Sequence, residues 1–281
     1  MVDGGYSLIF SATAQICLKF ASACSSVARG AMASQLPHFI LQPALPATLS
    51  VVGEQLAFAV RRVYCVGRNY HDHAVEMEAK QKDLGISAGD QVRDPPFFFQ
   101  KPGLGAIVDA SHPKAVARYP PKTRQLEFEL ELVVALKSGG RRIPAADALS
   151  HVYGSALGVD LTRRDLQHKA KADRRPWDAA KGFDDSAPVG ALTPGYVPDG
   201  GVGLELTVGG EVKQACAVGQ MIYGVADIIH HLSHEVELCP GDVIFTGTPA
   251  GVGPLQVGDE VTCTATDGTL QPCTFTVAAP L

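Results

Sequence analysis

The chain has 281 residues, of which 46% are hydrophobic and 19% charged, so it can bury a sizeable core in one large domain or two small ones. Its formal net charge of −5 and its pI near 6.0 give no basic surface for nucleic acid, and no apolar run has membrane-spanning length. The seven cysteines include no CxxC pair, which is typical of thiols in a reducing compartment and favours a cytoplasmic protein.

The first 31 residues differ in composition from the rest of the chain. They are rich in Ala and Ser, and Met32 begins a more ordinary sequence. We interpret residues 1–31 as a disordered leader or a misplaced start; a transit peptide is the alternative, but arginine is sparse there. Residues 32–60 are predicted to form an extended, Pro-containing lead-in, and residues 61–281 to form the folded domain.

Short strands and tight turns dominate the predicted elements, as 29 Gly and 19 Pro indicate. In chain order, strands are predicted at 62–66, 96–99 (buried), 126–136 and 152–159, a hairpin at 202–219, and alternating strands and glycine turns over 241–277. Helices are predicted at 70–82, from 145 and at 220–236, with a polar loop at 83–96. This pattern indicates a mostly β fold of the α+β class, with a mixed or closed sheet and a few peripheral helices.

The segment 126–136 carries three glutamates spaced two residues apart. Glu127, Glu129 and Glu131 therefore share one face of a strand, and the run then becomes apolar on both faces. Carboxylates that enter a core repel one another unless positive charge meets them. The segment is either an edge strand with a wet acidic face or part of a divalent-cation site. Asp160, at the end of the next apolar strand, could add a third oxygen ligand, although Asp also caps helices.

Three other features could take part in chemistry. His73 and Glu76 are three residues apart in a predicted helix, so the carboxylate could orient the imidazole as a general base, unless the pair is merely exposed. Lys181, near the single Trp, could bind a substrate carboxylate, or it could be a solvated surface lysine. The Gly-rich turn at 246–253 could present N–H groups to an anion, or it could be a plain β-turn.

Six blocks of sequence occur in an order that resembles the fumarylacetoacetate hydrolase family. They are VYCVGRNYHDHAVEM, PPFFFQKP, ELELVV, GVDLTRRDLQ, RPWDAAKGFDDSAPVG and PGDVIFTGTPAGVG. The first two blocks are most similar to fumarylpyruvate hydrolases, and next to acylpyruvases and oxaloacetate decarboxylases. The resemblance implies a mixed β-roll, β-sandwich-like fold of the family's C-terminal domain type over residues 61–281, and a homodimer.

The resemblance also implies a site. Mg²⁺ or Mn²⁺ would be held by Glu129, Glu131 and Asp160, and a catalytic dyad falls on His73 and Glu76. The family's substrate-contact positions match Gln167, Lys181 and Thr248, of which the lysine also counts as catalytic.

The implied reaction is hydrolysis of the C–C bond of a 2,4-diketo acid such as fumarylpyruvate, which gives fumarate and pyruvate. Water deprotonated by His73 would attack the 4-carbonyl, and the cation would stabilise the pyruvate enolate. The alternatives are an acylpyruvase, an oxaloacetate decarboxylase or an isomerase of the same family, and a non-catalytic metal-stabilised binding protein. Glu127 is not counted as a ligand; we expect it to tune the charge of the site or to meet solvent.

Overall fold

The computed structural model describes residues 40–41, 43–76 and 95–280. The chain divides into two compact units, Met1–Leu45 and Pro46–Leu281, and every described helix and strand lies in the second. The predicted leader 1–31, the end of the predicted helix 70–82 and most of the predicted loop 83–96 lie outside the described residues. No helix within the described part is both long and apolar enough to cross a membrane.

Strands outnumber helices in the described part of the chain. The strands are β1 (Thr48–Leu49), β2 (Phe58–Ala59), β3 (Arg62–Gly67), β4 (Phe97–Lys101), β5 (Ile107–Asp109), β6 (Val116–Arg118), β7 (Leu126–Phe128), β8 (Leu130–Leu136), β9 (Val152–Val159), β10 (Thr162–Arg163), β11 (Ala187–Val189), β12 (Thr193–Pro194), β13 (Gly203–Val208), β14 (Glu211–Ala217), β15 (Asp242–Phe245), β16 (Gly253–Leu255), β17 (Glu260–Ala265) and β18 (Cys273–Ala278). The helices are α3 (Gly103–Ala106), α4 (Ala145–Ala148), α5 (Arg164–Ala172), α6 (Asp178–Lys181) and α7 (Val225–Glu235), with 3-10 turns at Leu149–His151 and Val218–Gln220 and a helical stretch at 71–76.

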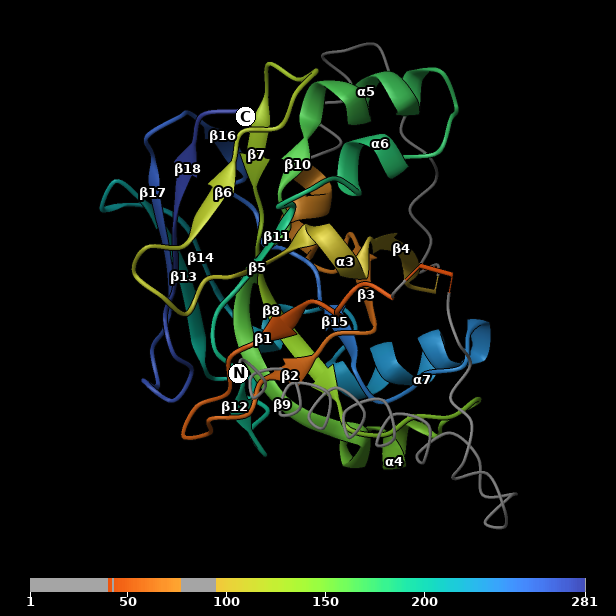
Figure 1. The fold of residues 1–281 in the computed structure, drawn as a ribbon. Helices are drawn as coiled ribbons and strands as arrows, with labels where there is room; N and C mark the ends of the chain where they lie inside the picture. Colours follow the sequence, from red (N-terminus) through yellow and green to blue (C-terminus); the bar gives the residue numbers. More distant parts are fainter. Residues whose placement is uncertain (1–39, 42, 77–94, 281) are drawn as a thin grey trace. The chain divides into compact units, whose positions relative to one another are not determined.

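The largest sheet is mixed and has the order β4-β3-β15-β8-β9-β11-β5, with β12 beside β9. In it β15 runs parallel to β3 and antiparallel to β8, and β11 runs parallel to β5. A second sheet has the order β14-β13-β17-β18-β6, and a third the order β10-β7-β16. Helices α5 and α6 lie near β10, toward the end of the main sheet opposite α4 and α7 (Figure 1). The predicted mostly β fold is therefore confirmed.

Strand β8 lies between β15 and β9 inside the main sheet, and all of its residues are buried. Successive side chains of β8 point to opposite faces of the sheet. Leu132 and Val134 pack into one hydrophobic cluster, and Val133 between them packs into another. This explains why the run becomes apolar on both faces, since neither face of β8 meets solvent.

The predicted single strand over 126–136 is in fact two strands. The chain leaves β7 at Phe128 and enters β8 at Leu130, so Glu129 stands at the junction. The break occurs because β7 pairs with β10 and β16, whereas β8 pairs with β15 and β9. The chain therefore changes sheets at Glu129.

The predicted buried strand at 96–99 is wrong in its burial. Strand β4 is at the edge of the main sheet, Phe97 is 39% exposed, and the next two phenylalanines are only half-buried. An edge strand has a neighbour on one side only, so apolar composition alone overstates its burial. By contrast, the hairpin predicted at 202–219 is confirmed by β13 and β14, and Gly209 and Gly210 at its turn both have positive φ.

Candidate active site

Three carboxylates meet where β7, β8 and β9 end or begin. Each of Glu129, Glu131 and Asp160 offers an oxygen, and these oxygens lie within 4.8 Å of one another. The β8–β9 register places Leu130 opposite Val159, and the Asp160 N–H donates to the Glu129 carbonyl at 2.8 Å. The three residues are 5%, 2% and 0% exposed, so the alternative of a wet acidic edge strand is wrong.

The triad has the composition of a divalent-cation site. Its donors are carboxylate oxygens, the hard ligands that Mg²⁺ and Mn²⁺ prefer. Burial, and then the charges of Asp160 and Glu129, raise the pKa of Glu131 well above its usual value. No salt bridge to Glu131 occurs within the described residues, so one carboxylate of the triad lacks a cationic side chain. The residues present therefore fit a divalent cation.

Two buried lysines neutralise the other triad members. The Lys181 ammonium donates to Glu129 Oε2 at 2.8 Å, to Asp160 Oδ2 at 2.7 Å and to Thr162 Oγ1 at 2.6 Å. Lys101 Nζ lies 2.7 Å from Asp160 Oδ1 and is completely buried. Burial lowers the pKa of Lys181, but the charges of Asp160 and Glu129 outweigh it and raise that pKa. The alternative of a solvated surface lysine at 181 is therefore wrong, and Lys101 is a site residue that the sequence did not indicate.

Glu127 is buried and paired, which corrects the expectation that it meets solvent. Arg164, the first residue of α5, donates from Nε to Glu127 Oε2 at 2.6 Å and from Nη2 to Glu129 Oε1 at 2.5 Å. The same guanidinium donates from Nη1 to Gln167 Oε1 at 2.5 Å, one helical turn later. Arg164 thus ties Glu127 and Gln167 to the triad, and it is a second site residue that the sequence reasoning missed.

The predicted dyad is close but not hydrogen-bonded. His73 is buried, and its Nδ1 lies 3.8 Å from Glu76 Oε2, too far for a hydrogen bond. Within the described residues His73 Nδ1 has no hydrogen-bond partner. The histidine lines one cavity with Glu129 and Glu131. The His73 imidazole therefore lies in the same cavity as the triad, whereas the Glu76 carboxylate does not line that cavity.

The Gly-rich turn after β15 binds two carboxylates of the protein itself. The Gly247 N–H donates to Glu131 Oε2 at 2.6 Å, and the Gly251 N–H donates to Glu76 Oε2 at 3.0 Å. Gly247 has φ of 99°, and a Cβ there would lie 2.6 Å from the Cβ of Asn69, so glycine is required. The predicted anion contact of this turn is therefore made to a metal-ligand candidate and to the dyad.

These contacts bring most of the predicted site residues to one cavity. Its lining includes His73, Glu129, Glu131, Gln167, Lys181 and Thr248. Asp160 lies behind the lining, and Glu76 is joined to it through the turn at Gly251. A family model described as Fumarylacetoacetate (FAA) hydrolase C-terminal matches residues 62–278.

The chain belongs to the fumarylacetoacetate hydrolase family. A crystal structure of fumarylpyruvate hydrolase from Pseudomonas aeruginosa, in complex with Mn²⁺ and pyruvate, is 40% identical, with a TM-score of 0.78 and coverage of 86% of this chain and 100% of that one. A Burkholderia cenocepacia structure, provisionally named a fumarylpyruvate hydrolase, is 45% identical, with a TM-score of 0.75 and coverage of 87% and 100%. The mitochondrial oxaloacetate tautomerase of Homo sapiens is 38% identical over 203 residues, which cover 72% of this chain and 85% of that protein. The mitochondrial oxaloacetate decarboxylase of Dictyostelium discoideum is 34% identical over 205 residues, with coverage of 72% and 88%.

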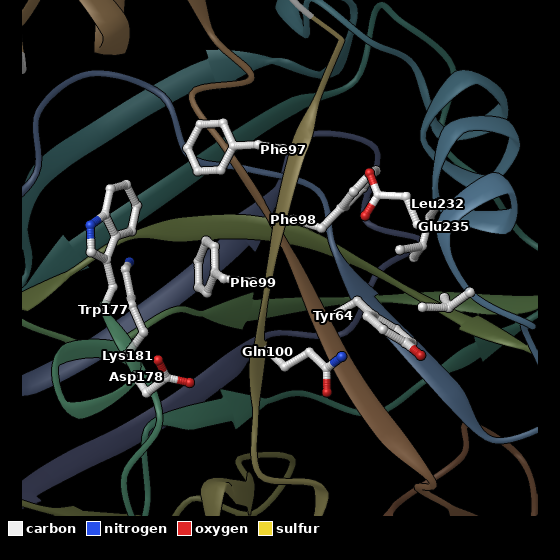
Figure 2. A pocket seen from close by; sticks show the side chains of 11 residues that line it. Tyr64, Phe97, Phe98, Phe99, Gln100, Trp177, Asp178, Lys181, Leu232 and Glu235 are labelled. Carbon is white, nitrogen blue, oxygen red and sulfur yellow. The ribbon is translucent and has the colours of Figure 1, made fainter. Parts of the chain in front are cut away.

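A cleft of about 490 Å³ lies beside the triad, and residues of β4 line it. Their side chains point to both sides of the strand. Phe97 and Phe99 project toward Trp177 and Lys181, whereas Phe98 projects to the other side of the strand (Figure 2). The Phe97 ring meets the Trp177 ring edge-on at 5.6 Å, and the Lys181 ammonium lies 5.2 Å from the Phe99 centroid. Aromatic side chains therefore shield the site on the β4 side.

Gln214, on strand β14 of the second sheet, makes hydrogen bonds to two segments that form the candidate site. It is 1% exposed on strand β14, whose other residues are exposed or half-buried. Its Oε1 accepts the N–H of Leu130, which lies between the two glutamates of the triad, at 2.8 Å. Its Nε2 donates to Thr248 Oγ1 and to the Pro249 carbonyl, both at 2.9 Å. One amide thus fixes the start of β8 relative to the Gly-rich turn.

Replacing Gln214 with Leu should lower the free energy of unfolding by about 1–3 kcal/mol, because the Leu130 N–H and the Pro249 carbonyl would stay buried without partners. Urea unfolding followed by fluorescence measures this change. The exposed neighbour Val212 provides the control, and Val212→Ala should shift stability by less than about 0.5 kcal/mol. Equal unfolding midpoints for the two variants would show that the brace is dispensable.

Proposed function

We propose that this protein is a metal-dependent hydrolase that cleaves the C–C bond of a 2,4-diketo acid. The proposed substrate is fumarylpyruvate, and the products are fumarate and pyruvate. The observation that supports this best is the buried triad Glu129, Glu131 and Asp160 next to the buried imidazole of His73. The relative from P. aeruginosa, a fumarylpyruvate hydrolase in complex with Mn²⁺ and pyruvate, supports both the metal and the substrate class.

The triad would hold Mg²⁺ or Mn²⁺ through its three carboxylates. When bound, such a cation supplies Lewis-acid stabilisation of the negative charge that develops on the enolate leaving group. Lys181 holds Glu129 and Asp160 in place and presents positive charge to the cavity, where it would neutralise a substrate carboxylate or an oxyanion. Gln167 and Thr248 line the same cavity and would orient the substrate by hydrogen bonds.

His73 would act as the general base. It would take a proton from water, whose oxygen attacks the C4 carbonyl; the C3–C4 bond then breaks and its electron pair forms the pyruvate enolate. The protonated His73 would return the proton to C3 of the enolate, which gives pyruvate and restores the base. The Nδ1 of the buried imidazole has no hydrogen-bond partner among the described residues, and it lies 3.8 Å from Glu76 Oε2. Closure of that gap by about 1 Å would orient the ring and stabilise its protonated form, since catalytic hydrogen bonds are often long before substrate binds.

Replacing His73 with Ala should lower kcat on fumarylpyruvate by about 100- to 10,000-fold, the usual contribution of a positioned general base. Mn²⁺ affinity should stay unchanged, because the histidine is not a triad member. Pyruvate release, coupled to lactate dehydrogenase, measures the rate. His71, exposed on the same helical stretch, supplies the control as His71→Ala. Normal turnover by the His73 variant would contradict the assignment of the base.

A second candidate is an oxaloacetate tautomerase or decarboxylase activity. It is favoured by the gap between His73 and Glu76 and by the bond from Gly251 to Glu76, because enolate chemistry on oxaloacetate needs no attacking water. The relatives from H. sapiens and D. discoideum act on oxaloacetate by name. Two results together would favour this candidate: the His73→Ala variant still turns over oxaloacetate, and the wild type does not turn over acylpyruvates. The homodimer and the cytoplasmic location stay predictions.

A further inference from the structure

The candidate cavity contains two basic side chains that the proposed reaction does not use. Lys171 and Arg68 line it together with Glu129, Glu131 and Thr248. Within the described residues neither basic group has a carboxylate in salt-bridge range; the salt bridges of this region are made by Lys101, Arg164 and Lys181. Two cations thus face the same space as the triad, and among the described residues neither has an anionic partner.

Helix α5 places Lys171 at a defined distance from the metal-ligand candidates. Arg164, Gln167 and Lys171 follow one another at three- and four-residue spacing, so they share one face of the helix. The first of them is bonded to Glu129, and seven residues of α-helix rise about 10 Å. A seven-carbon diketo acid spans about 8 Å end to end at C–C bond lengths near 1.5 Å. The two lengths are similar, and the long Lys171 side chain leans toward the N-terminus of the helix and lines the same cavity as Glu129 and Glu131, so a ligand that begins at the triad can reach it with its far end.

The groups around the Lys171 ammonium position it but do not neutralise its charge. Its ammonium lies 4.9 Å from the ring centroid of Trp177, the residue that precedes α6. Burial, and then the charges of Arg164 and Arg68, lower the pKa of Lys171 to about 8, and Lys181 acts in the same direction while Glu129 opposes it. Arg68 itself has φ of 55°, a left-handed conformation that is uncommon for non-glycine residues. An anion between the two basic groups would relieve their repulsion.

We propose that Lys171, assisted by Arg68, binds the distal carboxylate of the substrate and so selects dicarboxylic 2,4-diketo acids over those with a neutral acyl group. This inference rests on the proposed function and adds to it the charge of the acyl end. In fumarylpyruvate the fumaryl carboxylate would occupy this subsite, whereas the methyl group of acetylpyruvate would leave both cations unpaired.

The test compares kcat/KM of the Mn²⁺-loaded wild type, Lys171→Met and Lys171→Arg on fumarylpyruvate and on acetylpyruvate. We expect the Met variant to lose about 10- to 100-fold on fumarylpyruvate, the effect of one charge-assisted hydrogen bond, mainly through KM. Its kcat/KM on acetylpyruvate should not change, and the Arg variant should keep the preference for the dicarboxylate. Lys169, exposed on the same helix and paired with Asp173, gives the matched control Lys169→Met.

An equal loss on both substrates would overturn the subsite, because a merely structural lysine would affect them alike. If the wild type turns over neither substrate, the proposed function fails, and the subsite is then judged by calorimetric binding of fumarate to the Mn²⁺-loaded protein. Weaker fumarate binding by the Met variant, restored in Lys171→Arg, would still support a dicarboxylate subsite. Equal fumarate affinity in the wild type and the Met variant would overturn it.

Discussion

Replacing Glu131 with Gln should abolish Mn²⁺ binding and lower kcat/KM on fumarylpyruvate about a thousandfold or more, since a bound cation stabilises the transition state by several kcal/mol. Glu131 is the informative choice because no described cationic side chain pairs with it. The amide oxygen can still accept the Gly247 N–H, so the local geometry is retained. Calorimetric titration with Mn²⁺ and pyruvate-release kinetics measure the two effects.

The stability of the metal-free protein provides the control for this variant. Burial, and then the charges of Asp160 and Glu129, raise the pKa of Glu131 in the folded state above its value in the unfolded chain. Ionisation therefore destabilises the metal-free wild type as the pH rises through the range between those two values. The Gln variant has no such proton to lose, so in EDTA it should unfold at the same temperature as the wild type or a higher one. Wild-type Mn²⁺ affinity in the variant would contradict the assignment of the ligand.

Replacing Lys101 with Met should have the largest effect on stability. The change removes the ion pair to the fully buried Asp160 and leaves the carbonyls of Leu161 and Lys181 without their donor. Loss of one partner of a buried pair lowers the free energy of unfolding by about 3–5 kcal/mol. Urea unfolding in EDTA measures the loss without the contribution of the metal.

Lys169→Met is the matched control for the Lys101 variant. The Lys169 side chain is 71% exposed and pairs with Asp173 at the surface, so its removal should change stability by less than about 1 kcal/mol. If the two variants unfold at the same urea concentration, the buried ion pair at Asp160 contributes no more than a surface pair, and the account of Lys101 is wrong.

Alternation in the sequence predicted where the acidic side chains lie but not what neutralises them. The period of two in 126–136 places Glu127, Glu129 and Glu131 on one face, and their burial agrees with the prediction of carboxylates in a core. Lys101 and Arg164 reach these carboxylates from β4 and α5, elements distant in the sequence. Such contacts depend on tertiary packing, which local periodicity does not encode.

The change of sheet at Glu129 and the brace by Gln214 were hidden for a related reason. An alternating strand has the same pattern whether its two halves pair with the same neighbours or with different ones. Gln214 is a single buried amide in a strand whose other residues are exposed or half-buried, so the local pattern did not indicate its burial. The ordered blocks of sequence, rather than any single pattern, indicated the family that the match over 62–278 then confirmed.

The most direct test of the proposed function is the product analysis of fumarylpyruvate incubated with the Mn²⁺-loaded protein. Proton NMR should show fumarate and pyruvate released in equal amounts, at a rate that falls to background when EDTA removes the metal. If fumarylpyruvate stays intact while oxaloacetate is tautomerised or decarboxylated by the same preparation, the hydrolase assignment is wrong.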